Sequence, residues 1–375
     1  MLDNTLPVLP IVRPTFPPLE AISERFAECL RTGQVTNGGR YVEEFEAALT
    51  EYLGVPTICF SSGMAALVAM LMAEGVSGRD VICPSLTFCA TPHAIKIAGG
   101  NPVFADIDPA TLTLDPVDVH RKLTSKTKAI VGVDVYGILC DYQVLASIGI
   151  EHDIRVMFDS APAFGSLWQG RPTASPMDCP QIFSFHATKP FSVGGEGGAF
   201  CGTNEFVIAE AKKIRNFGQP AFPEIYPTIG FNGKMQEINA LVGLEALKVL
   251  PSYLTNRRFA ASCLVEQLRY VPGVGCMKSP LGQSPSWCYY PIRIDEQSFG
   301  MSRDAVVTKL ATRGIIVRKY YEACHLSDVY AEQRTSLPVT EKVASQVIAL
   351  PIYNNMTIAE CERVTGAIRD IQATT

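Results

Sequence analysis

The stretch FSFHATKPFSVGGEGGAF, residues 183–200, joins an apolar run to a glycine-rich turn and places a single lysine, Lys189, between them. The apolar run predicts a buried strand, and desolvation at its end would favour the neutral form of the amine. A neutral lysine amine can attack a carbonyl and form a Schiff base, and glycines let the backbone approach a bulky ligand closely. The alternative is a lysine that extends from the strand end into solvent. The glycines of the turn are Gly194, Gly195, Gly197 and Gly198.

Length and composition indicate a large soluble protein. The chain has 375 residues, of which 47% are hydrophobic, enough for a large core and two structural units. It has 32 basic and 37 acidic residues, a formal net charge of -5, so we expect no nucleic-acid partner. The most apolar stretch, residues 57–76, is interrupted by Ser61, Ser62 and Gly63, and neither part is long enough to cross a bilayer. No signal-peptide pattern is present, and we expect a cytoplasmic protein with no membrane partner.

The twelve cysteines show no C-x-x-C spacing and lie within apolar segments. In a long intracellular chain this pattern is typical of buried thiols that pack as small hydrophobic side chains. We therefore expect neither a disulfide framework nor a metal site.

Seven apolar runs alternate with helix-like segments between residues 40 and 245. Strands that are apolar almost throughout and alternate with helices predict a mostly parallel sheet covered on both faces. Ligands of such sheets bind beyond the carboxyl ends of the strands. The predicted strands are residues 57–62, 80–85, 101–107, 128–137, 155–160, 181–187 and 197–203.

The remainder of the chain predicts a smaller α/β domain. We expect a large domain at residues 1–245 and a small carboxyl-terminal domain at residues 246–375. The predicted elements are a helix-rich bridge at 235–268, strands at 286–294 and 315–321, and helices at 302–314, 341–348 and 358–371.

Polar and aromatic residues follow several predicted strands. Asp159 closes one strand and could pair with the ring nitrogen of pyridoxal phosphate, or could cap a helix. The Ser62-Gly63 turn precedes a helix, whose amino end could bind a phosphate, although small residues are common in such turns. Ser184 could add a hydroxyl to that site. Phe88 could stack on a flat ring or belong to the core.

Together these features match one ligand with an aldehyde, a ring nitrogen, a ring face and a phosphate. No G-x-G-x-x-G motif follows the first predicted strand, as a hydride-transferring enzyme would require. The sequence resembles the DegT/StrS-type nucleotide-sugar aminotransferases, which are fold type I pyridoxal-phosphate enzymes. The similar segments include SSGMAAL (61–67), PSLTFCAT (84–91), FDSAPAFG (158–165), SFHATK with GGEGGAF (184–200) and GFNGKMQEINALVGL (230–244).

The resemblance implies a role for each of these residues. Lys189 would carry the cofactor as a Schiff base, Asp159 would pair with the ring nitrogen, and Phe88 would stack on the ring. Asn232 would reach the phosphate in the neighbouring subunit of a homodimer with shared active sites. Around the phosphate of the chain's own site the resemblance places Ser62, Gly63, Met64 and Ser184.

The sequence departs from the family pattern at four positions. Met64 stands where the family usually has threonine, and Pro162 stands where it usually has glutamine or histidine. Because proline has no N–H donor, a contact to the phenolic oxygen of the cofactor must be lost or replaced at Pro162. Asp134 and Tyr353 each stand in place of a common histidine.

The implied reaction is amino transfer from L-glutamate, which leaves as 2-oxoglutarate, to a keto sugar nucleotide. Lys234 lies in a segment similar to relatives that act at C4 of a 4-keto-6-deoxy sugar, in pathways such as O-antigen synthesis. Alternatives are a 3-keto sugar nucleotide, a cyclitol ketone, or a non-catalytic regulator on the same fold. The candidate substrate residues, which could equally be a solvated rim, are Lys234, Arg318, Lys319, Tyr320 and His325.

Overall fold

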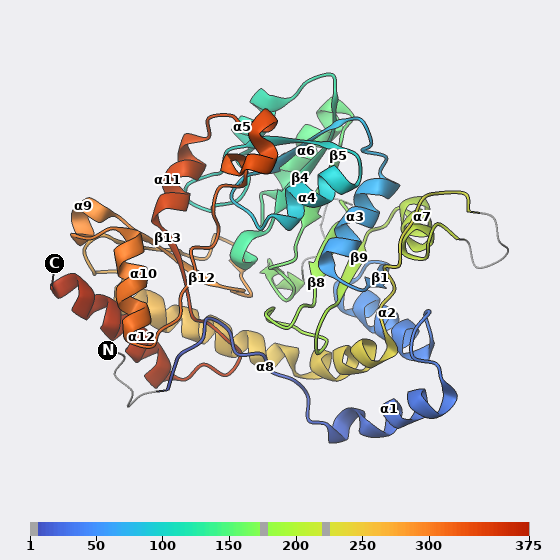
Figure 1. Ribbon diagram of the computed structural model, residues 1–375, viewed down its shortest axis with the longest axis horizontal. Coiled ribbons are helices and arrows are strands. Elements are labelled where there is room, and N and C mark those ends of the chain that lie inside the picture. The colour runs from blue at the N-terminus through green and yellow to red at the C-terminus, as the bar shows by residue number, and fades with distance from the viewer. Residues whose placement is uncertain (1–6, 173–178, 220–225, 375) are drawn as a thin grey trace.

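The computed structural model describes residues 7–172, 179–219 and 226–374. Its main element is a seven-stranded sheet with the order β1-β9-β8-β5-β4-β2-β3 (Figure 1). Neighbouring strands are parallel except that β9 runs antiparallel to both β1 and β8. The predicted mostly parallel sheet is therefore confirmed. The strands are β1 (Thr57–Phe60), β2 (Asp80–Pro84), β3 (Asn101–Ala105), β4 (Thr127–Val133), β5 (Arg155–Asp159), β8 (Gln181–Ser184) and β9 (Gly198–Cys201).

Helices cover both faces of this sheet because alternate side chains of each strand point to opposite faces. In β2, Val81 and Cys83 pack in one apolar cluster with α3, α4 and α7, whereas Ile82 packs in another with α5 and α6. The helices α2 and α8 (Glu237–Leu268) cover the β1–β9–β8 part of that second face. The helices of this layer are α2 (Arg40–Leu53), α3 (Gly63–Ala73), α4 (Ala90–Ile97), α5 (Pro116–Lys122), α6 (Tyr142–His152) and α7 (Glu205–Arg215).

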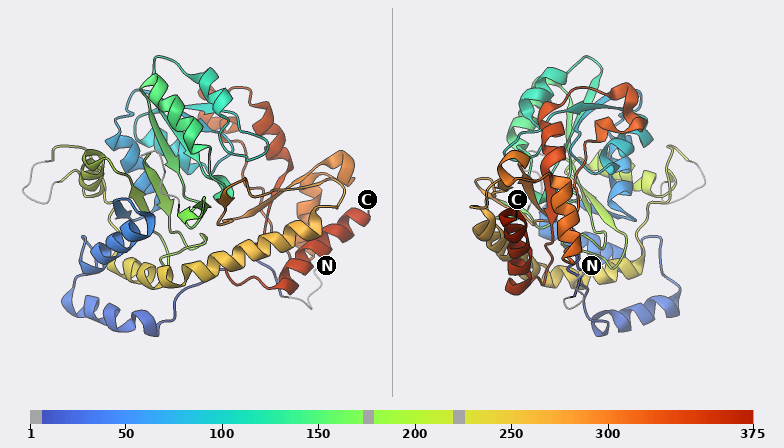
Figure 2. Two further views of the ribbon diagram at one scale, coloured as in Figure 1. Left: turned by 180° about the vertical axis from the view of Figure 1, so that it is seen from behind. Right: turned by 60° about the vertical axis from the view of Figure 1, so that its left-hand side comes forward.

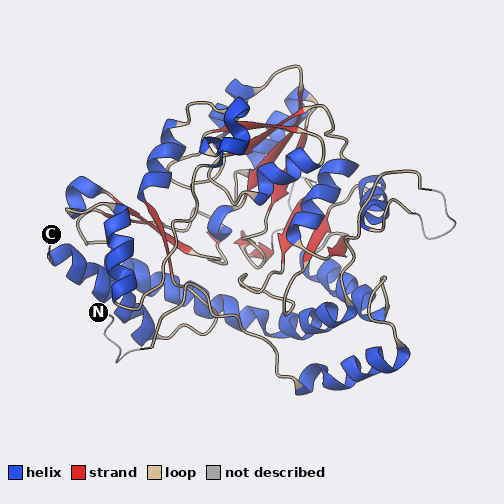
Figure 3. Ribbon diagram, viewed as in Figure 1, coloured by secondary structure: helices blue, strands red, loops and turns tan. Residues whose placement is uncertain are grey.

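The carboxyl-terminal part forms a second, smaller sheet, seen in red beside the main sheet in Figure 3. It is antiparallel, with the order β10 (Val274–Cys276), β12 (Tyr290–Ile294) and β13 (Val347–Leu350). Its helices are α9 (Glu296–Phe299), α10 (Arg303–Thr312), α11 (Pro338–Gln346) and α12 (Ile358–Ala373). The chain also forms α1 (Glu20–Thr32), the short strands β6 (Leu167–Trp168), β7 (Arg171–Pro172) and β11 (Gln283–Ser284), and 3-10 turns at Val135–Gly137, Cys324–Leu326 and Asp328–Gln333.

One long helix, α8 (Glu237–Leu268), runs beneath both parts of the molecule (Figures 1 and 2). Its residues up to Leu254 pack against the main sheet with α2. From Ala260 onward its buried side chains belong to the core of the smaller part. The predicted domain boundary after residue 245 therefore falls inside a continuous helix, and the two-domain division stays an interpretation.

Two predictions for the carboxyl-terminal part were wrong in detail. Residues 315–321 form no regular strand, because within the described residues they make two isolated bridges to different partners, Ile315 with Leu9 and Arg318 with Ala349. The predicted helix at 341–348 ends at Gln346. The apolar run that begins at Val347 forms β13, which pairs with β12 in the smaller sheet. Its β-branched and apolar residues, all buried, are typical of a strand rather than of a helix end.

The glycine turn of residues 194–198 allows close contacts within the protein itself. A Cβ atom at Gly198 would lie 2.5 Å from the backbone nitrogen of Gly63, and one at Gly197 would lie 2.5 Å from Val193 Cγ2. Gly194 has a positive φ of 83°. The expectation that these glycines make room for a ligand is corrected at Gly197 and Gly198, where the close neighbour is the chain.

The structure contains no disulfide among the described cysteines. Most are buried or half-buried, but Cys89 is exposed, contrary to the expectation for the whole set. Within the described ranges, no helix combines the length and the apolar character needed to cross a membrane.

Candidate active site

A cavity of about 410 Å³ lies at the edge of the sheet where the parallel strands end. Asp159, at the end of β5, and Ser184, at the end of β8, both line it. This is the edge at which parallel α/β sheets bind their ligands. Eight residues predicted from the sequence contribute to the wall: Ser62, Gly63, Met64, Phe88, Asp159, Ser184, Lys189 and Tyr320.

Lys189 lies in the turn that connects β8 to β9. Its backbone N–H donates to the carbonyl of His186 at 2.9 Å, and the neighbouring N–H of Ala187 donates to the carbonyl of Gly195 at 2.9 Å. These bonds hold the lysine segment against the glycine turn. Among the described residues that line the cavity, Lys189 is the only lysine. It therefore supplies the one primary amine that could react with a carbonyl there.

Asp159 is almost fully buried and its two oxygens have separate partners. Thr91 Oγ1 donates to Oδ2 at 2.7 Å, and the N–H of Ala161 donates to Oδ1 at 3.1 Å. Burial raises the pKa of Asp159, while these two hydrogen bonds and the charge of Lys189 oppose the rise. A cationic ring N–H beside this carboxylate would favour its ionised form further.

The amino end of α3 forms another part of the wall. Ser62 is the N-cap, and its hydroxyl accepts the N–H of Ala65 at 3.1 Å. The first N–H groups of a helix have no partner within the helix and carry a partial positive charge, which suits an anion. A Cβ atom at Gly63 would lie 2.8 Å from the Cβ of Ser184, so only glycine brings the helix end this close to β8.

Residues 19–369 match the model of the DegT/DnrJ/EryC1/StrS aminotransferase family. The chain belongs to this family. It is 33% identical over 372 residues to the dTDP-4-amino-4,6-dideoxy-D-glucose transaminase of Shigella dysenteriae, covering 96% of this chain and 98% of that protein. It is 31% identical over 351 residues to the GDP-perosamine synthase of Caulobacter vibrioides, covering 92% of this chain and 93% of that protein. A solved structure of DesI, obtained in the presence of its TDP-sugar product, superposes with a TM-score of 0.92 at 34% identity, covering 99% and 94%.

As a member of this family the chain is a pyridoxal-phosphate-dependent aminotransferase with the expected fold. The donor set of the cavity fits that cofactor. A lysine amine, a buried carboxylate with a hydroxyl partner, and the amino end of α3 suit an aldehyde, a protonated ring nitrogen and a phosphate respectively. The contacts of the individual residues to the cofactor stay predictions.

Phe88 lies in the loop after β2 and is 56% exposed. It lines the cavity, as its predicted stacking role requires. Pro162 also lines the cavity, and its carbonyl accepts the hydroxyl of Ser286 at 3.2 Å. Proline at this position therefore joins the wall to the segment that leads into β12.

Several residues of the site were missed from the sequence. Thr91 is the hydroxyl partner of Asp159, although it lies 68 residues away along the chain. Tyr289 and Tyr321 line the cavity with Tyr320, and the rings of Tyr289 and Tyr320 lie 5.2 Å apart. His186 also lines it, and its Nδ1 lies 2.7 Å from Thr188 Oγ1. The position of His186 within the SFHATK segment was a signal that could have identified it.

Asn232 and Lys234 do not line the cavity of their own chain, within the part of the chain that the structure describes. Lys234 Nζ donates to Asn232 Oδ1 at 2.8 Å and lies 4.7 Å from the ring centroid of Phe217. Burial and the nearby charge of Arg215 lower the pKa of Lys234. Their predicted roles stay predictions.

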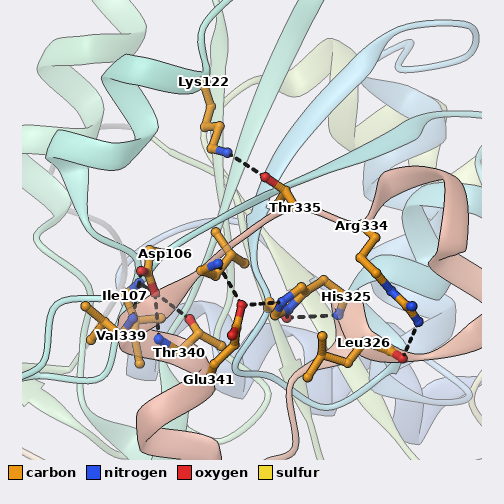
Figure 4. Close-up of polar contacts among 12 residues, drawn as sticks. Asp106, Ile107, Lys122, His325, Leu326, Arg334, Thr335, Val339, Thr340 and Glu341 are labelled. Carbon is orange, nitrogen blue, oxygen red and sulfur yellow. Dashed lines mark hydrogen bonds and ion pairs between the residues drawn. The ribbon is translucent and has the colours of Figure 1, made fainter.

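The three remaining substrate candidates also lie outside the described lining. The backbone of Arg318 pairs with Ala349, and Lys319 Nζ forms an ion pair with Asp304 at 3.0 Å. His325 is fully buried behind the wall, where it contacts Ser85 and Glu341 (Figure 4).

Two family departures lie in buried positions. Tyr353 lies beneath the guanidinium of Arg13, 4.4 Å from the ring centroid. Asp134 follows β4, and its carboxylate accepts the hydroxyls of Ser160 at 2.5 Å and Tyr142 at 2.6 Å and the N–H of Cys140 at 2.9 Å. Asp134 therefore supports the turn that carries Asp159.

Asp134 gives the protein a specific pH dependence. Burial raises the pKa of Asp134 to about 6, against the effect of its hydrogen bonds. Because the unfolded pKa is about 4, the folded state binds more protons between about pH 4 and 6, and this group lowers stability as the pH rises through that window. Relative to Asp134→Asn, the wild type should lose on the order of 3 kcal/mol of unfolding free energy between pH 4 and pH 7.

Urea denaturation of both proteins at pH 4, 5, 6 and 7 measures this difference. Asp153→Asn makes the same change of charge at an exposed position and serves as the control. Curves of unfolding free energy against pH that run parallel for the wild type and Asp134→Asn would contradict the prediction.

Proposed function

We propose that this aminotransferase moves the amino group of L-glutamate to the ketone of a dTDP-4-keto-6-deoxyhexose and forms a 4-amino-4,6-dideoxy sugar nucleotide. The observation that carries the proposal is the convergence of Lys189, Asp159 and the amino end of α3 on one cavity. The substrate class is supported by the 33% identity to a dTDP-4-amino-4,6-dideoxy-D-glucose transaminase. A cytoplasmic location and a role in polysaccharide synthesis such as that of O-antigen belong to the same proposal.

Each residue has a defined part in this reaction. When bound, pyridoxal phosphate supplies an aldehyde that takes up the amino group and a ring that withdraws electrons. The amine of Lys189 holds the cofactor and then moves a proton to or from the α-carbon of the amino donor. Asp159 keeps the ring nitrogen protonated, and Thr91 orients the carboxylate by donating to Oδ2 at 2.7 Å. The N–H groups at the amino end of α3 bind the phosphate, with Ser184 beside them.

Fewer residues of this chain are placed to bind the sugar and its diphosphate than to bind the cofactor. Tyr320 is the one substrate candidate of the sequence that lines the cavity. Lys319 would need to leave Asp304 before it could bind a diphosphate, but the two side chains are 38% and 60% exposed, and such surface pairs cost little to open. Arg318 and Lys319 therefore stay proposed diphosphate ligands.

A second nucleotide is supported by the 31% identity to a GDP-perosamine synthase. The identities to the two relatives, 33% and 31%, differ too little to separate the two nucleotides. GDP-linked substrate is therefore the second candidate.

The function is tested by incubating the enzyme with L-glutamate and a panel of keto sugars. The panel contains dTDP- and GDP-linked 4-keto-6-deoxyhexoses, a dTDP-linked 3-keto sugar and a cyclitol ketone. Mass spectrometry should show replacement of the ketone by an amine in the dTDP-linked 4-keto sugar, together with 2-oxoglutarate. Product only from the 3-keto sugar or the cyclitol would contradict the proposed substrate.

We further propose that the active unit is a homodimer in which Asn232 and Lys234 serve the partner's site. The segment before them exposes apolar side chains, with Tyr226 60% and Ile229 81% exposed. Neither Asn232 nor Lys234 reaches the cavity of its own chain within the described residues. In a closed two-fold dimer such sharing is reciprocal.

Mixing two inactive variants should restore part of the activity. Lys189→Ala removes the amine, and Asn232→Asp sets a carboxylate against the phosphate. In a mixed dimer one site combines an intact Lys189 with an intact Asn232 from the other subunit, so about half of the activity per mixed dimer should return. The measurement is turnover after co-expression with two different tags and purification of the heterodimer. An inactive heterodimer would place Asn232 in its own chain's site or in neither.

A further inference from the structure

Two segments from distant parts of the sequence both contribute to the cavity wall. The loop after β2 contributes Thr87 and Phe88, and the segment that follows Arg318 contributes Tyr320 and Tyr321. Neither segment belongs to a regular helix or strand. Their separation must therefore be set by contacts outside the cavity.

Those contacts concentrate at Ser85 and His325, which lie just behind the wall. Ser85 Oγ and His325 Nδ1 are 2.6 Å apart, and the backbone N–H of His325 donates to the same Oγ at 3.0 Å. The N–H of Cys324 donates to the carbonyl of Ser85 at 3.0 Å. Leu86 forms an antiparallel bridge with Ala323. The two segments are thus joined immediately beside their cavity-lining residues.

The other ring nitrogen of His325 connects the pair to α11. His325 Nε2 lies 3.4 Å from Glu341 Oε1, which also accepts the N–H of Leu337 at 2.9 Å (Figure 4). The amino end of α11 is in turn held to the end of β3, because Asp106 accepts the N–H and the hydroxyl of Thr340, each at 2.7 Å. The imidazole therefore lies between two anchored elements.

These partners define one arrangement of hydrogen atoms. Because the N–H of His325 donates to Ser85 Oγ, the hydroxyl hydrogen of Ser85 is free to donate to Nδ1. Nε2 then carries the hydrogen and faces Glu341. Burial lowers the pKa of His325, against the effect of Glu341, which suits this neutral form. Each polar side-chain atom of the pair then has a partner.

We propose that His325 is a positioning residue, whose buried hydrogen bond to Ser85 fastens the Tyr320–Tyr321 segment to the Thr87–Phe88 loop and so sets the width of the cavity. The bond acts on the substrate only through the wall, since both Ser85 and His325 have no exposed surface. The consequence for the sugar rests on the proposed function, whereas the bond itself does not. Loss of one partner in a buried hydrogen bond leaves the other unsatisfied, which corresponds to about a tenfold change in a local equilibrium.

The test is hydrogen–deuterium exchange of the full chain saturated with pyridoxal phosphate, read by mass spectrometry. Ser85→Ala removes the hydroxyl and keeps the backbone contact to Cys324. We expect exchange to become about tenfold faster in both wall segments, residues 85–89 and 318–326. Arg334→Ala is the matched control, because Arg334 Nη2 donates to the carbonyl of Leu326 at 2.9 Å from an exposed position. Arg334→Ala should leave the exchange rate of residues 85–89 unchanged.

Two variants of His325 separate the functions of its two nitrogens. An asparagine amide can occupy the place of Nδ1, whereas a glutamine amide can reach the place of Nε2. His325→Asn should therefore protect residues 85–89 from exchange better than His325→Gln. Ser85→Ala combined with His325→Gln should show no faster exchange in residues 85–89 than the worse single variant, because both break one bond.

Kinetics distinguish positioning from direct substrate contact. We expect Ser85→Ala to raise KM for the keto sugar about tenfold with a much smaller change in kcat. Unchanged exchange in both wall segments of Ser85→Ala would overturn the proposal, as would exchange rates that multiply in the double variant. If His325→Asn lost most of its turnover while Ser85→Ala kept the wild-type KM, His325 would instead contact the substrate directly. The exchange measurements need no sugar, so they stand even if the proposed substrate is wrong.

Discussion

Replacing Lys189 with alanine is expected to abolish amino transfer. In the proposed mechanism the amine both carries the cofactor and moves the proton at the donor's α-carbon, so its loss would remove nucleophilic and general-base catalysis together. We expect kcat to fall on the order of 10⁴-fold or more. Single-turnover assays with L-glutamate give the rate, and borohydride reduction of the wild type followed by peptide mapping should place the pyridoxyl group on Lys189.

The matched control for this prediction is Lys319→Ala, which also removes one lysine. Lys319 pairs with Asp304 outside the described cavity lining, so this variant should keep the borohydride label on Lys189. Lys189→Ala should still bind some cofactor through the phosphate site at the amino end of α3. A pyridoxyl label on another lysine, or turnover in Lys189→Ala close to wild type, would end this assignment.

Asp159→Asn should give the second largest loss. Asparagine keeps the size of the side chain but removes the anion that we propose holds a proton on the ring nitrogen. Each unit by which the pKa of the ring nitrogen falls is worth about 1.4 kcal/mol. We expect a fall of about two units and a weaker electron withdrawal by the ring, which together should lower kcat about 10³-fold. The measurement combines kcat with a pH titration of the absorbance of the bound cofactor.

Thr91→Val provides the graded control for Asp159. It removes only the 2.7 Å hydrogen bond to Oδ2 and leaves the carboxylate in place. A hydrogen bond to a charged group is worth about 1.5–3 kcal/mol, so kcat should fall about tenfold to a hundredfold. Because that bond lowers the pKa of Asp159, its removal should raise this pKa further. Asp159→Asn with turnover equal to that of Thr91→Val would contradict the proposed role of the charge.

Much of the large domain could be predicted because its signals are local. Seven apolar runs became the seven strands of the main sheet, since strand and helix periodicity depends on neighbouring residues. The Ser62-Gly63 turn before α3 is another local signal, and it was placed at the cavity as expected. Lys189 and Asp159 were identified by their positions at strand ends together with the family resemblance. Their convergence followed because parallel strands present their carboxyl ends at one edge.

The carboxyl-terminal part was harder to predict because its strands depend on distant partners. Val347 and Ile348 continue an apolar helical pattern in the sequence, but they become part of β13 because β12 offers its edge to them. Residues 315–321 have strand-like composition, yet among the described residues they form two isolated bridges, Ile315 with Leu9 and Arg318 with Ala349, and no continuous strand. Composition alone does not distinguish these outcomes, because strand pairing is decided by the availability of an edge.

The sequence by itself determined the family, the sheet and the two residues proposed to be central to the chemistry, because those signals lie in short segments. Only the tertiary structure decided what surrounds them. It made Thr91 the partner of Asp159, placed Gly198 against Gly63, and put Lys319 beside Asp304. It also moved His325 from a candidate substrate contact to a buried partner of Ser85. Such contacts join residues up to 240 positions apart, and no local pattern encodes a hydrogen bond across that separation.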